Sequence, residues 1–178
     1  MTTTTTRRTS AALSLLIACA TLQAGCATTR DGIRVPGHER VFVAVFVDES
    51  ATGEVGVALA EAIQIEVYGR DPDRLAMTFD ESSLALDGTV HALDEREVSG
   101  GEREIAIRAT VLLVDKQGAR LGEIGPVESR ATYRPIAGDA RATDEARRAA
   151  IARIVRTLAT YVTREIDARG RAEAARAA

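Results

Sequence analysis

The hydrophobic positions in the first half of the chain predict a strand followed by an amphipathic helix. Residues 41–47 (VFVAVFV) are all apolar and rich in β-branched and aromatic types, which is typical of a strand buried on both faces. Asp48-Glu49-Ser50 comes next and is typical of a turn and a helix cap. Apolar residues then recur at helical spacing over about 53–69. Gly69, followed by Asp71-Pro72, predicts the end of this helix.

The middle of the chain predicts a meander of strands. Apolar stretches, most of them alternating with polar residues, indicate strands at 75–79, 84–90, 105–114 and 120–133. The polar stretch 94–103 contains Gly100-Gly101 and is expected to be a turn. Asp115-Lys116-Gln117-Gly118 predicts a hairpin. Pro126 lacks a backbone N–H and therefore favours an edge strand or a bulge.

A long helix is predicted near the C-terminus, after a loop over 134–141. Thr143 is the expected N-cap, and the two acidic residues after it suit the positive end of a helix dipole. An apolar stripe then continues to Ile166. Gly170 is expected to end the helix and to leave 170–178 as a flexible tail.

Together these elements predict one two-layer α+β domain over residues 41–169. A roughly four-stranded sheet would bury two helices on one of its faces. The chain has 178 residues, enough for one such core, and its 3% aromatic content with no Trp means that this core must be aliphatic. The connection after the first strand has to cross back into the sheet and is expected to be right-handed.

Residues 1–25 have the pattern of an export signal peptide. Arg7 and Arg8 give a positively charged start, an apolar run begins at Ala11, and small residues precede Cys26. The stretch 22–26 (LQAGC) resembles the lipobox of bacterial lipoproteins, which implies cleavage before Cys26 and lipid attachment to it. Cys19, which follows Leu-Ile-Ala, is an alternative lipidation site, and a plain secretory signal is a further alternative.

Residues 26–40 lack periodicity and are predicted to be a tether between the lipid and the domain. Several acyl chains on one cysteine would anchor the protein stably. Ala27, where an Asp would retain a lipoprotein on the inner membrane, implies by analogy an outer-membrane location.

Charge and chemistry argue against several classes of function. The formal net charge of −3 gives no general attraction to nucleic acid, and the scarcity of aromatics leaves no platform for base stacking. Two Cys and two His argue against a zinc site. Neither His38 nor His91 has a sequence context for catalysis, and no phosphate-binding loop is present. We therefore expect a protein that is not an enzyme and needs no cofactor or metal.

Two basic regions are candidate contacts for phosphate groups. The last helix carries arginines away from its apolar stripe, at Arg147, Arg148, Arg153, Arg156 and Arg164. Lys116 and Arg120 flank Gly118 at the predicted hairpin. Arginine suits bidentate recognition of phosphate, although an ordinary solvated surface also explains both regions.

The order of these segments resembles the LPS-assembly lipoprotein LptE family. The resemblance covers nearly all of residues 26–169 and rests on a lipobox cysteine, a tether, VFVAVFVDES with a following ALAEAI, LALDGTV at 84–90, the predicted hairpin and a closing helix. It implies two helices packed on a four-stranded sheet. It also implies a non-enzymatic protein that plugs the lumen of the outer-membrane β-barrel LptD, assists its assembly and helps it to receive lipopolysaccharide.

Carried onto this chain, the resemblance implies that Cys26 is the lipid anchor and that the domain faces the periplasm from the outer membrane. The implied partner is an LptD-like barrel, and Lys116 and Arg120, near a strand turn, are the implied lipopolysaccharide contacts. The chain departs from the family's Cys-Gly-Phe start with Cys26-Ala27-Thr28. The alternative is an outer-membrane-anchored accessory lipoprotein that activates a periplasmic synthase or belongs to a secretion or transport complex.

Overall fold

The computed structural model describes residues 40–50 and 53–177, apart from the side chains of residues 173, 174 and 177. All of them lie in the second of the two units into which the chain divides, Asp31–Ala178. The predicted signal peptide 1–25, the tether 26–40 except Arg40, and both cysteines lie outside the described residues.

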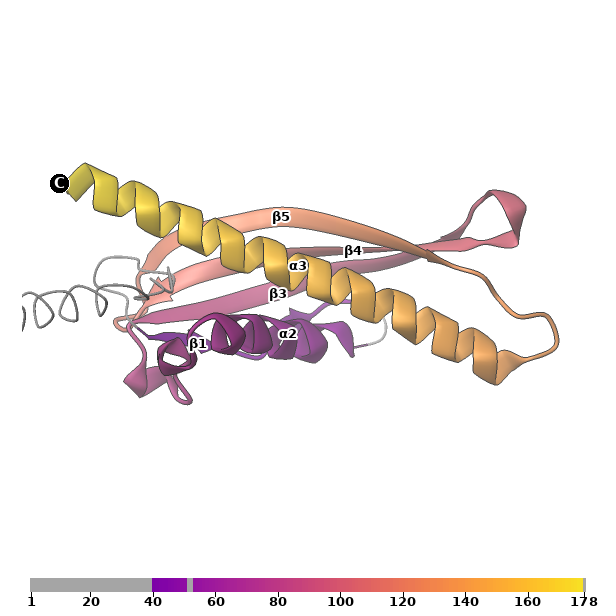
Figure 1. Ribbon diagram of the computed structural model, residues 1–178, viewed down its shortest axis with the longest axis horizontal. Helices are drawn as coiled ribbons and strands as arrows, with labels where there is room; N and C mark the ends of the chain where they lie inside the picture. The colour runs from indigo at the N-terminus through magenta and orange to yellow at the C-terminus, as the bar shows by residue number, and fades with distance from the viewer. Residues whose placement is uncertain (1–39, 51–52, 178) are drawn as a thin grey trace, which may run out of the picture. The chain divides into compact units, whose positions relative to one another are not determined.

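Two helices cover one face of a mixed sheet (Figure 1). The elements in chain order are β1 (Val41–Val43), β2 (Val47–Asp48), α2 (Val55–Arg70), β3 (Leu84–Glu97), β4 (Arg103–Asp115), β5 (Arg120–Tyr133) and α3 (Ala140–Ala177), with short 3-10 helices at Pro72–Arg74, Phe79–Glu81 and Ser99–Gly101. The strand order is β1-β3-β4-β5, and β2 also pairs with β3. β1 and β2 run parallel to β3, whereas β4 and β5 continue the sheet as an antiparallel meander. The predicted two-layer α+β fold is confirmed.

The core lies between the helices and the sheet and is aliphatic, as predicted. β4 shows the alternation most clearly, because Ile105, Ile107 and Val111 are buried while Arg108 on the opposite face is exposed. The buried apolar residues of the described part include two aromatics, Phe46 and Tyr133.

The first predicted strand is divided in two, so the prediction of one strand buried on both faces is wrong. Among the described residues, β1 is an edge strand, and no described helix covers the sheet face away from α2 and α3, here called the uncovered face. Phe46 points into the core, while Val45 and Val47 on either side of it are 67% and 58% exposed. Asp48 then accepts hydrogen bonds from the backbone N–H groups of Val55 and Gly56, at 2.8 and 2.9 Å, which confirms the predicted capping cluster.

The predicted turn over 94–103 is much shorter than expected. β3 continues to Glu97, and β4 begins at Arg103, which is its pairing partner. Gly100 and Gly101 adopt positive φ in the remaining connection. The polar residues belong to the strands because they bond across them, as Arg96 does to Glu104. Alternating hydrophobicity alone therefore underestimates both strands.

The prediction of a short strand at 75–79 is also wrong. This region holds two 3-10 helices and a single bridge between Leu75 and Val41. Pro72 stands near the start of the first of these helices, and the Asp71 side chain accepts a hydrogen bond from the N–H of Asp73. Local turn chemistry thus replaces an extended strand.

The predicted end of α2 is correct to within one residue, because α2 ends at Arg70 with Asp71 at its C-cap. The predicted bounds of α3 are wrong, since α3 continues through Gly170 to Ala177. The N-cap of α3 is Asp139, whose carboxylate accepts a hydrogen bond from the N–H of Ala142 at 2.9 Å. Thr143 therefore lies inside the first turn, where its hydroxyl bonds to the backbone of Ile136 and Asp139.

Candidate functional site

The β4–β5 hairpin carries Lys116 and Arg120, the two residues expected to contact lipopolysaccharide. The Asp115 carboxylate accepts hydrogen bonds from the backbone N–H groups of Gln117 and Ala119, both at 2.8 Å, and shapes the turn. Gly118 has a φ of 81°, which glycine adopts without strain. The predicted hairpin is confirmed, and so is the edge position of β5, which has an irregular register around Pro126.

The two basic side chains of the hairpin differ in how they are paired. Arg120 is exposed, and its guanidinium forms an ion pair with Glu123. Lys116 is exposed and has no ion pair with any described residue. The hairpin therefore offers one unpaired charge and one that Glu123 partly neutralises.

Helix α3 places a third basic side chain beside this hairpin. Arg169 donates a hydrogen bond to the backbone carbonyl of Glu123 at 2.7 Å and forms an ion pair with Glu165. Its guanidinium crosses β5 at Gly122, where a Cβ would lie 2.9 Å from Arg169 Nη1. Sequence reasoning missed Arg169, although a glycine within a strand is a known signal of a close approach.

The hairpin lies at the same end of the sheet as the start of β1. Leu84 pairs with Val41 on one side and with Asp115 on the other. The carbonyl of Arg40 accepts hydrogen bonds from the N–H groups of Ser83 and Leu84 at 3.0 and 3.1 Å. The described chain therefore begins at the hairpin end of the sheet.

Glu95 joins three strands and helix α3. Its carboxylate accepts hydrogen bonds from Tyr133 at 2.5 Å, Arg147 at 3.0 Å and Arg103 at 3.2 Å. Burial acts to raise the pKa of Glu95, but the hydrogen bonds from Tyr133, Arg147 and Arg103 outweigh it and hold the pKa below its ordinary value. Arg147 therefore faces the sheet, which corrects the prediction that it lies on the outer side of the helix.

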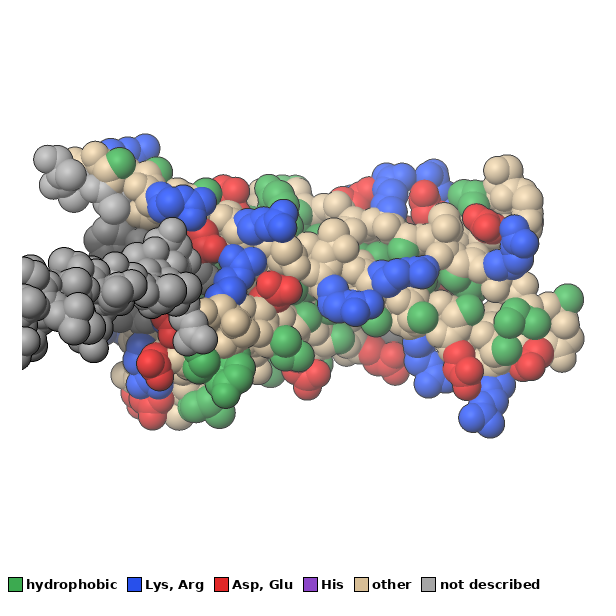
Figure 2. All heavy atoms as spheres, viewed as in Figure 1, with side chains coloured by type: hydrophobic (Ala, Val, Ile, Leu, Met, Phe, Trp, Pro, Cys, Tyr) green, Lys and Arg blue, Asp and Glu red, His purple; other side chains and the backbone are tan. Residues whose placement is uncertain are grey.

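The other arginines of α3 that the sequence singles out are exposed. Arg153 donates a hydrogen bond to the carbonyl of Thr132 at 2.8 Å, and Arg156 to the carbonyl of Ala152 in its own helix at 3.3 Å. Figure 2 shows basic side chains recurring over α3 on the helix-covered face. This surface and the hairpin together are the basic regions that could meet phosphate groups.

The uncovered face of the sheet carries a continuous network of ion pairs. Glu104 pairs with Arg96 at 2.6 Å and with Arg130 at 3.4 Å, and Glu128 pairs with Arg130 at 2.5 Å and with Arg108 at 3.2 Å. The hydrogen bonds from Arg130 and Arg108 hold the pKa of Glu128 below its ordinary value. With Asp94 and Ala106, these residues line a hollow of about 240 Å³. The face is highly polar, but most of its charge is internally neutralised.

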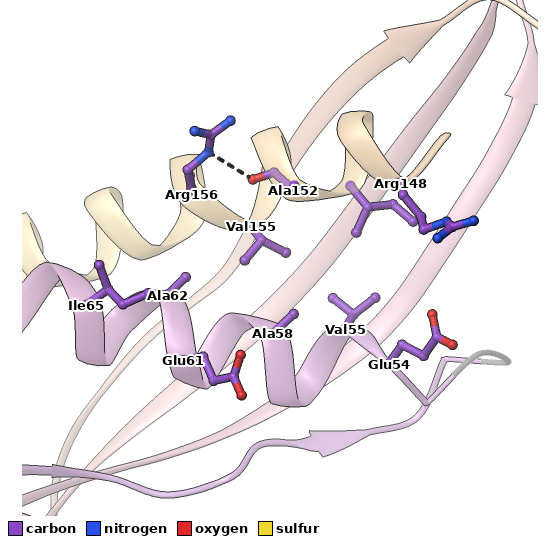
Figure 3. Close-up of a pocket in the computed structure, with 11 residues that line it drawn as sticks. Glu54, Val55, Ala58, Glu61, Ala62, Ile65, Arg148, Ala152, Val155 and Arg156 are labelled. Carbon is purple, nitrogen blue, oxygen red and sulfur yellow. Dashed lines mark hydrogen bonds between the residues drawn. The ribbon is translucent and has the colours of Figure 1, made fainter. Parts of the chain in front are cut away.

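A second hollow, of about 380 Å³, lies between α2 and α3 (Figure 3). Its floor is apolar and is formed by Val55, Ala58, Ala62, Ile65, Ile151, Ala152 and Val155. Glu54 and Glu61 border it on the α2 side, and Arg148 and Arg156 on the α3 side. We call this feature the interhelical groove. The sequence does not reveal it, because it depends on how far apart the two helices lie.

The described part of the chain shows neither a group of metal ligands nor a helix suited to span a membrane. The Nε2 atom of His91 lies 2.9 Å from the hydroxyl oxygen of Thr110, and its Nδ1 atom lies 3.3 Å from the carboxylate of Glu49. His38 lies outside the described residues. No group of three or more His, Cys, Asp or Glu side chains among the described residues is placed to hold a metal ion. None of the described helices combines the length and apolar character that crossing a membrane requires.

Comparison with known proteins identifies the fold. The sequence matches no protein-family model and no curated protein. Its structure is similar to a provisionally assigned lipoprotein of Caulobacter crescentus, with a TM-score of 0.56 and 18% identity over 78% of this chain and 92% of that one. It is also similar to a minor lipoprotein of Acinetobacter baumannii (TM-score 0.51, 16% identity, 75% and 94% covered). The third is uncharacterized lipoprotein B of Nitrosomonas europaea (TM-score 0.54, 12% identity, 80% and 90% covered). At these identities the likeness establishes the fold alone, and that fold is one found among bacterial lipoproteins.

Proposed function

We propose that this chain is an outer-membrane lipoprotein with the role of the LptE family. In this role it is a non-enzymatic plug and assembly partner of an LptD-like β-barrel that delivers lipopolysaccharide to the cell surface. The observation that carries the proposal is a sheet with the order β1-β3-β4-β5 and two helices on one face, which agrees with the two helices on a four-stranded sheet that the family resemblance implies. Its occurrence in solved lipoproteins supports the lipidated half of the proposal.

The polar surface of the domain supports the plug role. The lumen of a large outer-membrane barrel is polar, so a plug must present polar groups that tolerate a nearby wall. On the uncovered sheet face, Arg96, Glu104, Arg130, Glu128 and Arg108 satisfy one another. A surface whose charges are already paired can approach a polar wall without leaving isolated charges desolvated.

The position of β1 supports the anchoring role assigned to Cys26. The described chain begins at the hairpin end of the sheet, and at full extension the residues from Cys26 to Arg40 would span roughly 45–50 Å. On such a tether the hairpin end of the domain would be free to approach the membrane surface, which would bring Lys116 and Arg120 within reach of lipid-borne phosphates.

The barrel partnership is tested by co-purification. The full-length chain, tagged at its C-terminus and expressed in its native membrane, is extracted in a mild detergent and captured. We expect a single large β-barrel protein in stoichiometric amount, identified by mass spectrometry. Capture of a periplasmic synthase or of secretion-complex subunits instead would favour the accessory-lipoprotein alternative. Capture without any barrel would refute the proposed role.

Lipopolysaccharide contact is tested by reversing the charge at the hairpin. We expect Lys116→Glu with Arg120→Glu to weaken binding of fluorescently labelled lipopolysaccharide by roughly two- to tenfold, since each exposed charge contact contributes little by itself. The matched control is Arg134→Glu with Arg141→Glu, which makes the same charge change at the opposite end of the sheet and should leave binding unchanged. Equal effects of the two pairs would remove Lys116 and Arg120 from the site.

A further inference from the structure

The interhelical groove leaves some apolar side chains exposed above a buried floor. Ile65 on the α2 side is 72% exposed, and Ala152 on the α3 side is also exposed. Val57 and Tyr68 extend the exposed apolar surface along α2 outside the groove. Apolar patches of this kind, when bordered by charges, mark interaction surfaces. The groove is therefore a candidate docking surface distinct from the hairpin.

The charges on the rims of the groove are unpaired and of opposite sign. Glu54 and Glu61 lie on the α2 side, Arg148 and Arg156 lie on the α3 side, and none of the four forms an ion pair with another described residue. Most charges of the uncovered sheet face, by contrast, are paired. In Figure 3, Glu54 and Arg148 lie toward one end of the groove, and Glu61 and Arg156 lie further along it.

We propose that a second copy of this chain docks on the interhelical groove as a two-fold symmetric dimer. A two-fold axis parallel to the groove would lay α2 of each copy over α3 of the other, because this rotation exchanges the two rims while keeping positions along the groove. Glu54 would then meet Arg148 of the other copy, and Glu61 would meet Arg156. Symmetry repeats both pairs. The same contact covers Ile65 and the apolar floor.

Self-complementarity of charge is what favours a second copy over another occupant. An acidic rim facing a basic rim, at matching positions, is the arrangement that an isologous interface requires. This inference concerns the chain alone and does not depend on the barrel partner. A failed co-purification of a barrel would therefore leave the dimer proposal standing, and a failed dimer test would leave the barrel proposal standing.

The proposal is tested with two differently tagged full-length copies, co-expressed and extracted in a mild detergent. Capture of one tag should retrieve the other when both copies are wild type. Glu61→Arg in both copies, or Arg156→Glu in both, places like charges together and should reduce retrieval by about tenfold. One Glu61→Arg copy with one Arg156→Glu copy restores opposite charges in both pairs and should restore retrieval. An unfolded variant could not produce this rescue.

The matched controls are Glu97→Arg and Arg134→Glu, which make equal charge changes at exposed positions outside the groove. Neither should alter retrieval. Three results would each overturn the proposal: wild-type copies that do not retrieve each other, retrieval that survives Glu61→Arg in both copies, or a mixed pair that shows no rescue. The first would leave the groove to a different partner, and the second would indicate shared micelles or another interface.

Discussion

At the scale of single residues, two glycines set how closely the segment around Phe46 meets its neighbours. A Cβ on Gly88 would lie 2.6 Å from two ring carbons of Phe46, and a Cβ on Gly56 would lie 2.5 Å from the Phe46 carbonyl oxygen. Both distances are shorter than any real contact, so only glycine fits. Neither residue has a positive φ, and the requirement is therefore for space and not for backbone freedom.

We predict that Gly88→Ala destabilises the domain by about 1–3 kcal/mol, because the core must shift to admit a methyl group against the Phe46 ring. The matched control is Gly69→Ala in α2, where an added Cβ meets nothing within 4 Å. That change should stabilise the domain by about 0.5–1 kcal/mol through the better helix propensity of alanine. Chemical denaturation measures both free energies of unfolding. A neutral Gly88→Ala would show that the ring moves freely.

At the scale of elements, the start of α2 depends on a side chain from the preceding strand. Glu54 occupies the N-cap position but makes no capping hydrogen bond, and Asp48 of β2 supplies the acceptor instead. Burial acts to raise the pKa of Asp48, but hydrogen bonds from Ser50, Gly56 and Val55 outweigh it and lower the pKa overall. The cap thereby fastens the helix to the strand as well as satisfying its first N–H groups.

We predict that Asp48→Ala costs about 0.5–2 kcal/mol of unfolding free energy at neutral pH, while Glu54→Ala costs much less. Because the folded pKa is lowered, the contribution of Asp48 is fully present above the unfolded pKa of about 4 and is lost as the pH falls through the folded value. The difference between wild type and Asp48→Ala should therefore shrink in acid. Urea denaturation at several pH values measures this difference, and a constant value across the series would contradict the role of the charge.

The ends of elements are also where sequence reasoning was least accurate. Glycine and threonine are good local signals, yet α3 passes through Gly170 and begins before Thr143. Gly170 is buried, and Arg169 beside it is anchored on β5, so tertiary contacts hold the helix beyond the local stop signal. At the other end, Asp139 takes the cap ahead of Thr143. Local sequence signals therefore suggest where a helix can end, and tertiary packing determines which of these ends the folded protein uses.

At the scale of the whole molecule, Glu95 ties the helix layer to the sheet. Its three hydrogen-bonding partners come from β4, β5 and α3, so one carboxylate connects elements that are far apart in sequence. Glu95 follows the register irregularity between Val90 and Ala92, which turns it toward the helix face, opposite Ile105. A polar group at that position is stable only because all its partners are present.

We predict that Glu95→Gln destabilises the domain by roughly 2 kcal/mol at neutral pH, because hydrogen bonds to a charged group are the strong ones. Glu97→Gln, two residues along the same strand and exposed, should change stability by less than about 0.5 kcal/mol. Because the pKa of Glu95 is lowered in the folded protein, its contribution to folding stability is fully present above the unfolded pKa of about 4.3. This contribution is lost as the pH falls through the folded pKa. Thermal unfolding at pH 7 and pH 3 distinguishes this from a purely steric effect, which would persist at both.

The fold was predictable from the sequence in outline, and the candidate site only in part. Periodicity located the two helices, and the turn residues around Gly118 located the β4–β5 hairpin that holds Lys116. The missing backbone N–H of Pro126 indicated the edge position of its strand. It could not show that polar residues such as Arg96 extend β3, because cross-strand ion pairs become visible only when the register is known. The interhelical groove and the position of Arg169 depend on the spacing of helices in three dimensions.

The parallel pairing of β1 with β3 has a consequence for the order of folding. β3, β4 and β5 are joined by short turns, so their pairing closes small loops and can proceed from Glu97 and Arg103 outward. Val41, in contrast, pairs with Leu84 only after the intervening chain, including α2, has been brought back to the sheet. Non-local contacts of this kind form late, because the chain loses the entropy of closing a long loop before the contact contributes any favourable energy. The segment nearest the proposed membrane anchor is thus expected to be the last to join the sheet and the first to leave it.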